Sequence, residues 1–141
     1  MDRQLEKDIF DFGAFLFEAW DTPFKDNAIE IFHVEYDISG CLTIQVDLLD
    51  HPDHQYQIAF SYVSAFRVLD EGGLLELWNK TTEFGGRPAR TSFRVRGHLW
   101  TKESPLSFLQ SAGWSYFICS HLNCVEIVTT ESPTITSRSP N

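Results

Sequence analysis

Two short clusters of histidine and cysteine carry the side chains best suited to metal binding. His51 and His54 flank a Pro-Asp pair, and two imidazoles with a nearby carboxylate can ligate zinc. The proline and the short spacing are more typical of an exposed turn, so we interpret this cluster as a turn. Cys119 and Cys124 flank a predicted turn that contains His121, and a metal site there would need a fourth ligand from elsewhere. We interpret them as small apolar residues of a hairpin and expect no metal and no cofactor.

Nucleophilic catalysis has no sequence signature in this chain. No cysteine lies in a protease signature, and four serines lack the context of a nucleophile elbow, namely Ser61, Ser64, Ser111 and Ser115. The glycine pairs at 72–73 and 85–86 do not follow a strand and open a long helix, as phosphate-binding loops do, and we interpret them as turns. We therefore expect no catalytic residue and lean toward a protein that is not an enzyme.

Charge is distributed unevenly along the 141 residues. Residues 1–75 carry 15 acidic and 4 basic side chains, a net charge of −11, whereas residues 76–141 carry 5 acidic and 7 basic, a net charge of +2. The total of −9 favours cationic partners. One interpretation is a surface that recognises a basic protein, and the alternative is that the charge only keeps the protein soluble. For the first we single out Asp11, Glu18, Asp21, Glu35 and Asp47.

The later half also holds a local basic run with interleaved aromatic residues. This pattern can bind RNA or single-stranded DNA, but the net charge of −9 opposes it. We expect no nucleic-acid partner and interpret the run as pairing with the acidic half. The same separation of charge makes a homodimer through opposite faces a rival to a foreign partner. The run comprises Arg87, Arg90, Arg94, Arg96 and Lys102, with Phe93 and Trp100 between them.

Aromatic residues supply a second functional hypothesis and the material for a core. The chain has 12 Phe, 4 Trp and 4 Tyr. A small ligand-binding or enzymatic domain would use some of them to line a pocket in the sheet, and we single out Tyr56, Tyr62, Trp78 and Trp100. No stretch approaches about 18 consecutive apolar residues, and residues 1–8 do not have the pattern of a signal peptide. We therefore expect a cytoplasmic protein with reduced thiols that does not associate with membranes.

The first predicted element is a long helix over residues 3–20. Leu5, Ile9, Phe12, Leu16 and Ala19 are spaced 4, 3, 4 and 3 residues apart, which places them on one stripe of a helix. Period-two alternation then predicts strands near 29–38, 42–48, 56–62 and 93–99, and aromatic and β-branched residues predict two more near 114–122 and 125–130. The expected class is α+β, in which the N-terminal helix packs on a curved, mostly antiparallel sheet of about six strands, with one or two short helical turns. We expect one domain over residues 1–131 and a flexible tail over residues 132–141.

The first two strands have a register that the apolar pattern predicts. A three-residue loop over residues 39–41 would place Tyr36 opposite Ile44 on the core side. On the outer face the same register would place His33 opposite Asp47, which we interpret as a surface pair of opposite charge worth at most about 1 kcal/mol.

Three segments carry a resemblance to a known group of proteins. They are residues 66–72 (FRVLDEG), 114–118 (WSYFI) and 124–128 (CVEIV). In the order of its predicted elements the chain resembles small uncharacterised bacterial proteins, some of which are similar to immunity proteins of toxin systems. The resemblance covers most of the domain and carries over no catalytic or binding residue. It implies a non-enzymatic cytoplasmic protein that acts by contact, with a basic toxin as the partner of an immunity-type protein.

Overall fold

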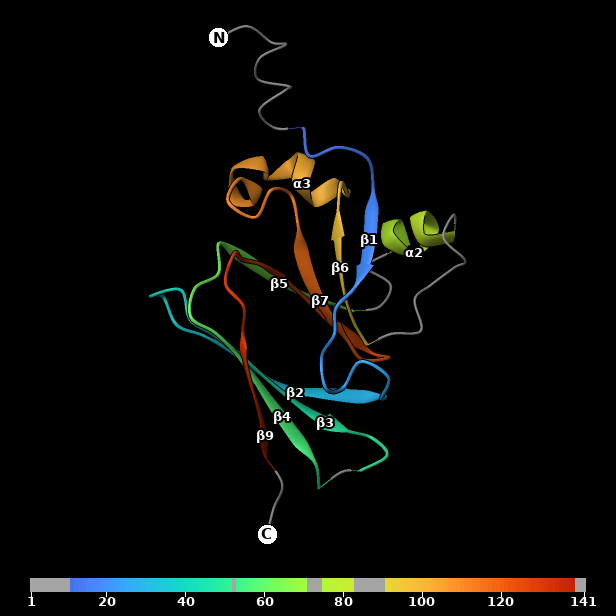
Figure 1. Cartoon of the computed structure of the whole chain (residues 1–141), viewed down its shortest axis with the longest axis vertical. Helices are drawn as coiled ribbons and strands as arrows, with labels where there is room; N and C mark the ends of the chain where they lie inside the picture. Colours follow the sequence, from blue (N-terminus) through green and yellow to red (C-terminus); the bar gives the residue numbers. More distant parts are fainter. Residues whose placement is uncertain (1–10, 52, 71–74, 83–90, 139–141) are drawn as a thin grey trace, which may run out of the picture.

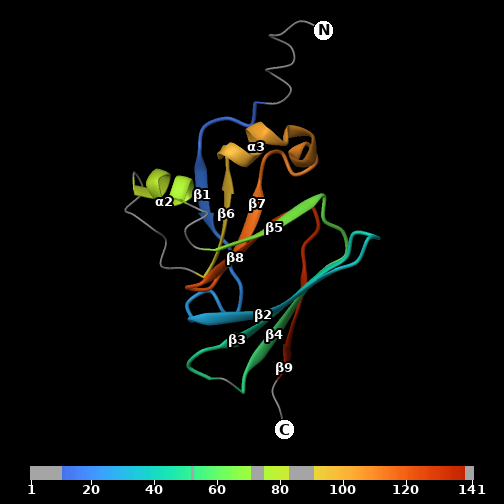
Figure 2. The same ribbon diagram turned by 180° about the vertical axis from the view of Figure 1, so that it is seen from behind.

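The computed structural model describes residues 11–51, 53–70, 75–82 and 91–138, and in these residues nine strands form two antiparallel sheets (Figures 1 and 2). Sheet A has the strand order β1-β6-β7-β8-β5, and sheet B has the order β2-β3-β4-β9. The described residues also form three short helical segments, namely α2 (Leu75–Thr81), α3 (Leu99–Glu103) and the 3-10 helix η3 (Pro105–Phe108). The strands are β1 (Leu16–Ala19), β2 (Ile29–Tyr36), β3 (Leu42–Leu48), β4 (Gln55–Phe60), β5 (Ala65–Asp70), β6 (Ser92–Arg96), β7 (Ser115–Cys119), β8 (Asn123–Val128) and β9 (Thr134–Arg138).

The predicted α+β class with a long N-terminal helix is wrong, and the described residues are close to all-β. Within the predicted helix, β1 pairs antiparallel with β6, and residues 3–10 lie outside the described residues. Gly13 has a φ of +85°, which a right-handed helix does not contain. Phe15 and Phe17, two residues apart and off the helical stripe, both pack into the core. Their spacing follows the period of a strand, which the helical pattern around them obscured.

The loop of the first hairpin begins one residue earlier than predicted. The Asp37 N–H donates to the Cys41 carbonyl at 2.9 Å, and Gly40, with a φ of +108°, takes the left-handed position before the second strand. Tyr36 therefore faces Leu42 instead of Ile44. A shift of two residues leaves the same side chains on the core face, so the apolar pattern alone does not distinguish the two registers.

A β-bulge in β2 changes the register again. The pairing shifts between Ile31 and His33, and Phe32 is 44% exposed. One extra residue in a strand reverses which side chains face the core beyond it. Asp47 therefore faces Glu30, and the predicted pairing of His33 with Asp47 is wrong because His33 faces Gln45.

The last described strand lies in the segment that was expected to be a flexible tail. β9 pairs antiparallel with β4 from Gln55–Arg138 to Ala59–Thr134. Ile135 packs against the core between the two sheets, which gives this strand an apolar anchor. Residues 134–138 are therefore part of sheet B, and the tail prediction is corrected for them.

Sheet A is covered on both faces, whereas sheet B is covered on one. The inner face of sheet B packs against one face of sheet A, and its apolar residues are Ile29, Leu42, Ile44, Val46, Leu48, Ile58 and Phe60, opposite Ile118, Val125 and Ile127. The other face of sheet A packs against α2 through Leu77, Phe93, Val95, Phe117, Cys119 and Cys124. The side chains on the outer face of sheet B are exposed or half-buried, and no described helix or strand packs on that face.

Candidate functional site

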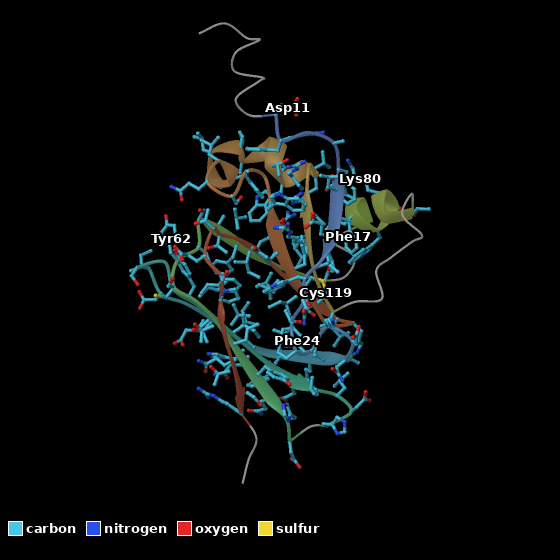
Figure 3. The ribbon with its side chains drawn as sticks, viewed as in Figure 1. Asp11, Phe17, Phe24, Tyr62, Lys80 and Cys119 are labelled. Carbon is cyan, nitrogen blue, oxygen red and sulfur yellow. The ribbon has the colours of Figure 1, made fainter. Side chains whose placement is uncertain are left out.

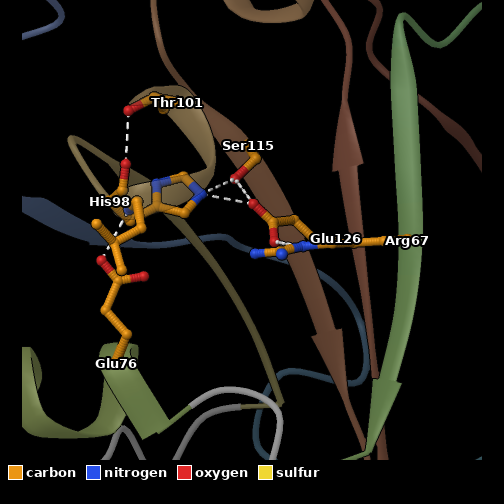
Figure 4. A network of polar contacts seen from close by, with 7 residues as sticks. Arg67, Glu76, His98, Thr101, Ser115 and Glu126 are labelled. Carbon is orange, nitrogen blue, oxygen red and sulfur yellow. Dashed lines mark hydrogen bonds and ion pairs between the residues drawn. The ribbon is translucent and has the colours of Figure 1, made fainter. Parts of the chain in front are cut away.

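One candidate site is a buried polar cluster in sheet A, formed by Arg67, His98, Ser115 and Glu126 (Figure 4). Arg67 on β5 lies directly opposite Glu126 on β8. His98 follows β6 after Gly97, whose φ is +81° and whose α-carbon would place a Cβ 2.7 Å from the Ala14 carbonyl oxygen. Only glycine fits this turn, and the turn brings His98 over the sheet.

The Glu126 carboxylate contacts each of the other three residues of the cluster. Its Oε1 accepts a hydrogen bond from Arg67 Nε at 2.7 Å, and its Oε2 lies 2.6 Å from His98 Nε2. The Ser115 hydroxyl donates to the same Oε2 at 2.7 Å. Arg67 also lies over the Trp100 ring, with its guanidinium carbon 4.3 Å from the ring centroid. The carboxylate is therefore compensated by a cation and by two further hydrogen bonds.

This cluster has the residue types of a catalytic triad but not its geometry. In a triad the serine bonds one ring nitrogen of the histidine and the acid bonds the other. Here the serine and the acid both lie at His98 Nε2, the Ser115 hydroxyl is 3.4 Å from that nitrogen, and Nδ1 has no partner among the described residues. His98 and Ser115 are 0% exposed and Glu126 is 1% exposed, so a substrate does not reach them. We interpret the cluster as a structural ion-pair network.

Three of the five predicted acidic residues have local partners. Asp11 Oδ1 accepts from the Gly13 N–H at 2.9 Å, Glu18 forms an ion pair with Arg94, and Asp21 lies 2.5 Å from Lys25 Nζ. Asp11 lies at the end of the molecule opposite sheet B (Figure 3). Glu18 lies on β1 of sheet A, so neither Asp11 nor Glu18 shares a surface with Glu35 and Asp47, and the Asp21 carboxylate is already paired with Lys25.

Glu35 and Asp47 lie together on the outer face of sheet B, and the register adds Glu30 to them. We use the name outer face of sheet B for the residues of three rows that cross the sheet. Each row has one residue from each of β2, β3, β4 and β9. The rows are Glu35, Thr43, Ala59 and Thr134, then His33, Gln45, Gln57 and Thr136, then Glu30, Asp47, Gln55 and Arg138. Sequence reasoning missed Glu30 because the bulge in β2 brings it into the row of Asp47.

The carboxylates of the outer face of sheet B lack the compensation that Glu126 has. Glu30 and Asp47 are directly opposite each other, and like charges in this position destabilise a sheet. Asp47 Oδ1 is buried and accepts no hydrogen bond from the described residues. Glu30 and Glu35 are exposed, and within the described part of the chain none of the three carboxylates forms an ion pair. The face therefore presents three carboxylates without an ion pair beside hydrogen-bonding side chains, and its one cation, Arg138, lies in the row of Glu30 and Asp47 without pairing with either of them.

The four aromatic residues proposed to line a pocket lie in different parts of the molecule. Tyr56 packs on Phe24 in the core between the sheets. Trp78 packs on Phe93 on the other face of sheet A, which is covered by α2. Trp100 lies over Arg67, and Tyr62 is 49% exposed at the surface. Tyr62 borders a surface hollow of about 340 Å³ with Ser64, Leu106, Ser107, Leu109 and Gln110. The hollow contains none of the other three aromatic residues.

Members of the predicted histidine and arginine clusters make contacts with aromatic side chains. His54 packs on Tyr56 and lies 3.1 Å from the Ser137 hydroxyl, and no group of three metal-binding side chains gathers in the described residues. Arg94 and Arg96 both lie over the Trp114 ring, with guanidinium carbons 4.2 and 5.2 Å from its centroid. Arg87 and Arg90 of the predicted basic run lie outside the described residues.

Comparison of the chain with protein-family models, curated proteins and solved structures finds no match. The resemblance to immunity proteins therefore stays a prediction. Neither α2 nor α3, the α-helices of the described residues, is long and apolar enough to cross a membrane.

Proposed function

We propose that this chain is a non-enzymatic binding protein whose outer face of sheet B holds a basic partner protein. The observation that carries the proposal is the grouping of Glu30, Glu35 and Asp47 on one open sheet surface without an ion pair to any described residue. Lys or Arg side chains of a partner would supply the missing compensation.

Two properties of the face support a protein partner. The sheet presents rows of Thr and Gln, whose side chains donate and accept hydrogen bonds, beside the carboxylates. The pair Glu30 and Asp47 costs about 0.2–1 kcal/mol of folding stability by repulsion between like charges, and a bound cationic group would remove this cost. A surface that destabilises the free protein and is relieved by a ligand is typical of a binding site.

The partner class that we propose is the one named by the immunity-type hypothesis, a basic toxin. A net charge of −9 steers a cationic protein toward the molecule, and the uncompensated face then fixes where it binds. Binding of this kind weakens as the ionic strength rises, because exposed charges are screened within about 8–10 Å at physiological salt.

The test uses two triple variants with the same change in net charge. One carries Glu30→Gln, Glu35→Gln and Asp47→Asn, and the control carries Asp11→Asn, Glu18→Gln and Asp21→Asn. Basic proteins captured from a lysate of the source organism by the wild-type chain are identified, purified and titrated calorimetrically against all three proteins. We expect the sheet variant to lose about 10–100-fold in affinity, at roughly 0.5–1 kcal/mol for each lost charge contact, and the control to lose less than about 3-fold.

Two outcomes would contradict the proposal. Equal losses in the two variants would show that net charge alone attracts basic proteins. Unchanged affinity in the sheet variant would show that the partner binds elsewhere. Circular dichroism of all three proteins confirms that the substitutions leave the fold intact.

A further inference from the structure

We propose that Cys119 and Cys124 form a redox-active dithiol pair that closes reversibly into a cross-strand disulfide. Cys119 ends β7 and Cys124 is the second residue of β8, and the two are directly opposite each other in the ladder. Cys119 lies near the end of sheet A away from α3 (Figure 3). In the structure both residues carry thiols.

The hydrogen bonds of the hairpin define the type of pair that the two cysteines form. The Ser120 N–H donates to the Asn123 carbonyl at 2.8 Å across the turn. Hydrogen-bonded and non-hydrogen-bonded pairs alternate along an antiparallel ladder, so the next pair, Cys119 and Cys124, is non-hydrogen-bonded. The Cys119 N–H agrees with this, because it donates to the Thr91 carbonyl at 2.8 Å, on the side away from β8.

This pair type meets the distance requirement of a disulfide. The α-carbons of a non-hydrogen-bonded pair lie about 4.5 Å apart, and those of disulfides lie about 4.4–6.8 Å apart. Both side chains project to the same face of sheet A, where they share a core with Leu77, Phe93 and Phe117. The Cβ atoms of facing residues are about 4.5–5.5 Å apart, with non-hydrogen-bonded pairs at the short end, and those of disulfides are about 3.5–4.5 Å apart with a mean near 3.8 Å. Closing the bond therefore draws the two strands together and stores strain, which makes the disulfide easy to reduce.

The exposure of the two paired cysteines sets the order of the chemical steps. Cys119 is 7% exposed and Cys124 is 1% exposed, and Cys119 borders the turn at the end of the ladder, where local opening costs least. The oxidant is a low-molecular-weight disulfide. The Cys119 thiolate attacks one of its sulfurs, the oxidant S–S bond breaks, and one thiolate leaves. The Cys124 thiolate then attacks Cys119 Sγ and the second thiolate leaves. The two protons of the cysteine thiols end on the released thiols, so the protein loses two electrons and two protons and the oxidant gains them.

The experiment uses the full chain with Cys41→Ser, which removes the exposed third thiol. The folded protein is equilibrated in buffers with increasing ratios of oxidised to reduced glutathione, quenched with acid and alkylated with a maleimide after unfolding. We expect a species that is lighter by two hydrogens and carries no alkyl group, and we expect it to revert when reduced glutathione is restored. Chymotrypsin cleaves after Leu122, between the two cysteines, so the two fragments should stay joined until a reductant is added.

The controls carry Cys41→Ser with either Cys119→Ser or Cys124→Ser. We expect Cys124→Ser to yield only the mixed disulfide of Cys119 with glutathione, and Cys119→Ser to react more slowly because Cys124 is more deeply buried. The proposal is wrong if both cysteines remain alkylated at every glutathione ratio. It is also wrong if the Cys41→Ser protein stops at a mixed disulfide, because Cys124 then does not reach Cys119.

Discussion

Glu126 in sheet A and Asp47 in sheet B are both carboxylates on strands, yet their surroundings are opposite. Glu126 faces the cation Arg67 across the ladder, is 1% exposed and has two further hydrogen-bond partners. Asp47 faces another carboxylate, Glu30, on an open face, and one of its oxygens has no partner among the described residues. A buried charge that is paired and hydrogen-bonded is costly to unpair, whereas a carboxylate without a cationic partner on an open face can be compensated by a bound protein.

The buried position of Glu126 is also why the residues around it, which resemble a catalytic set, are not the site that we propose. Ser115, His98 and Glu126 include the residue types of hydrolytic chemistry, but their arrangement satisfies one carboxylate and leaves no route for a substrate. The side chains on the outer face of sheet B are not arranged for catalysis. They do carry charge, they can form hydrogen bonds, and a partner protein can reach them. We therefore interpret the first region as structural and propose the second as the binding surface.

The largest expected effect is the loss of the Glu126 charge. Glu126→Gln leaves Arg67 without its carboxylate partner and disturbs the buried hydrogen bonds to His98 and Ser115, so we expect the free energy of unfolding to fall by about 3 kcal/mol. Urea unfolding measures this change in the free energy of unfolding. Glu18→Gln is the matched control, because it breaks an exposed pair with Arg94 and should cost less than about 1 kcal/mol. Equal costs for the two variants would remove the distinction between buried and exposed carboxylates.

The turn that places His98 should be the next most sensitive position. Gly97→Ala puts a methyl group 2.7 Å from the Ala14 carbonyl oxygen at a residue with a φ of +81°. We expect a loss of about 2 kcal/mol in thermal or urea unfolding, from the left-handed backbone and the contact together. An alanine variant as stable as the wild type would mean that the turn does not hold His98 in place.

Removing an open carboxylate should have a smaller effect of the opposite sign. Asp47→Asn relieves the repulsion from Glu30, so we expect the free energy of unfolding to rise by about 0.5 kcal/mol. Glu35→Gln is the control, because Glu35 faces Thr43 and its stability change should be close to zero. If Asp47→Asn destabilises the protein as Glu126→Gln does, then Asp47 has a structural partner and the contrast between the sheets fails.

The smallest effect concerns Asp37, a surface carboxylate that does have a donor. The backbone N–H of Ser39 lies 2.9 Å from its Oδ1 and lowers the pKa of the carboxyl, and the Ser39 hydroxyl lowers it further. A depressed pKa in the folded state contributes stability above the unfolded pKa, and this is lost as the pH falls through the folded pKa. We expect NMR titration to place the midpoint below the ordinary aspartate value and Ser39→Ala to raise it partway. A midpoint at or above the ordinary value would contradict this assignment.

The sequence predicts most strands but not the division into two sheets. The alternation in β3 and the aromatic and β-branched residues of β7 and β8 identify strands because these patterns are local. Pro105 likewise identifies the start of η3. The helix predicted over residues 3–20 fails for residues 16–19 because their partner, β6, lies more than 70 residues away and no local pattern encodes that pairing.

The candidate site is predictable only in part for the same reason. Glu35 and Asp47 are visible as polar residues in alternating strands, but the bulge that brings Glu30 opposite Asp47 has no signature in the sequence. Glu126 does have one, since it is the only charged residue of its strand and lies between Val125 and Ile127, and such a residue needs a buried partner. The identity of that partner, Arg67, depends on the pairing of β5 with β8.

The proposed binding of a basic ligand to the outer face of sheet B can be tested by NMR titration of the wild-type chain with an oligolysine peptide, followed through the side-chain carboxyl carbons. We expect the largest shift changes at Glu30, Glu35 and Asp47, we expect them to diminish as salt is added, and we expect Glu126 not to respond. Changes of equal size at Asp11, Glu18 and Asp21, or a response at Glu126, would contradict this proposal.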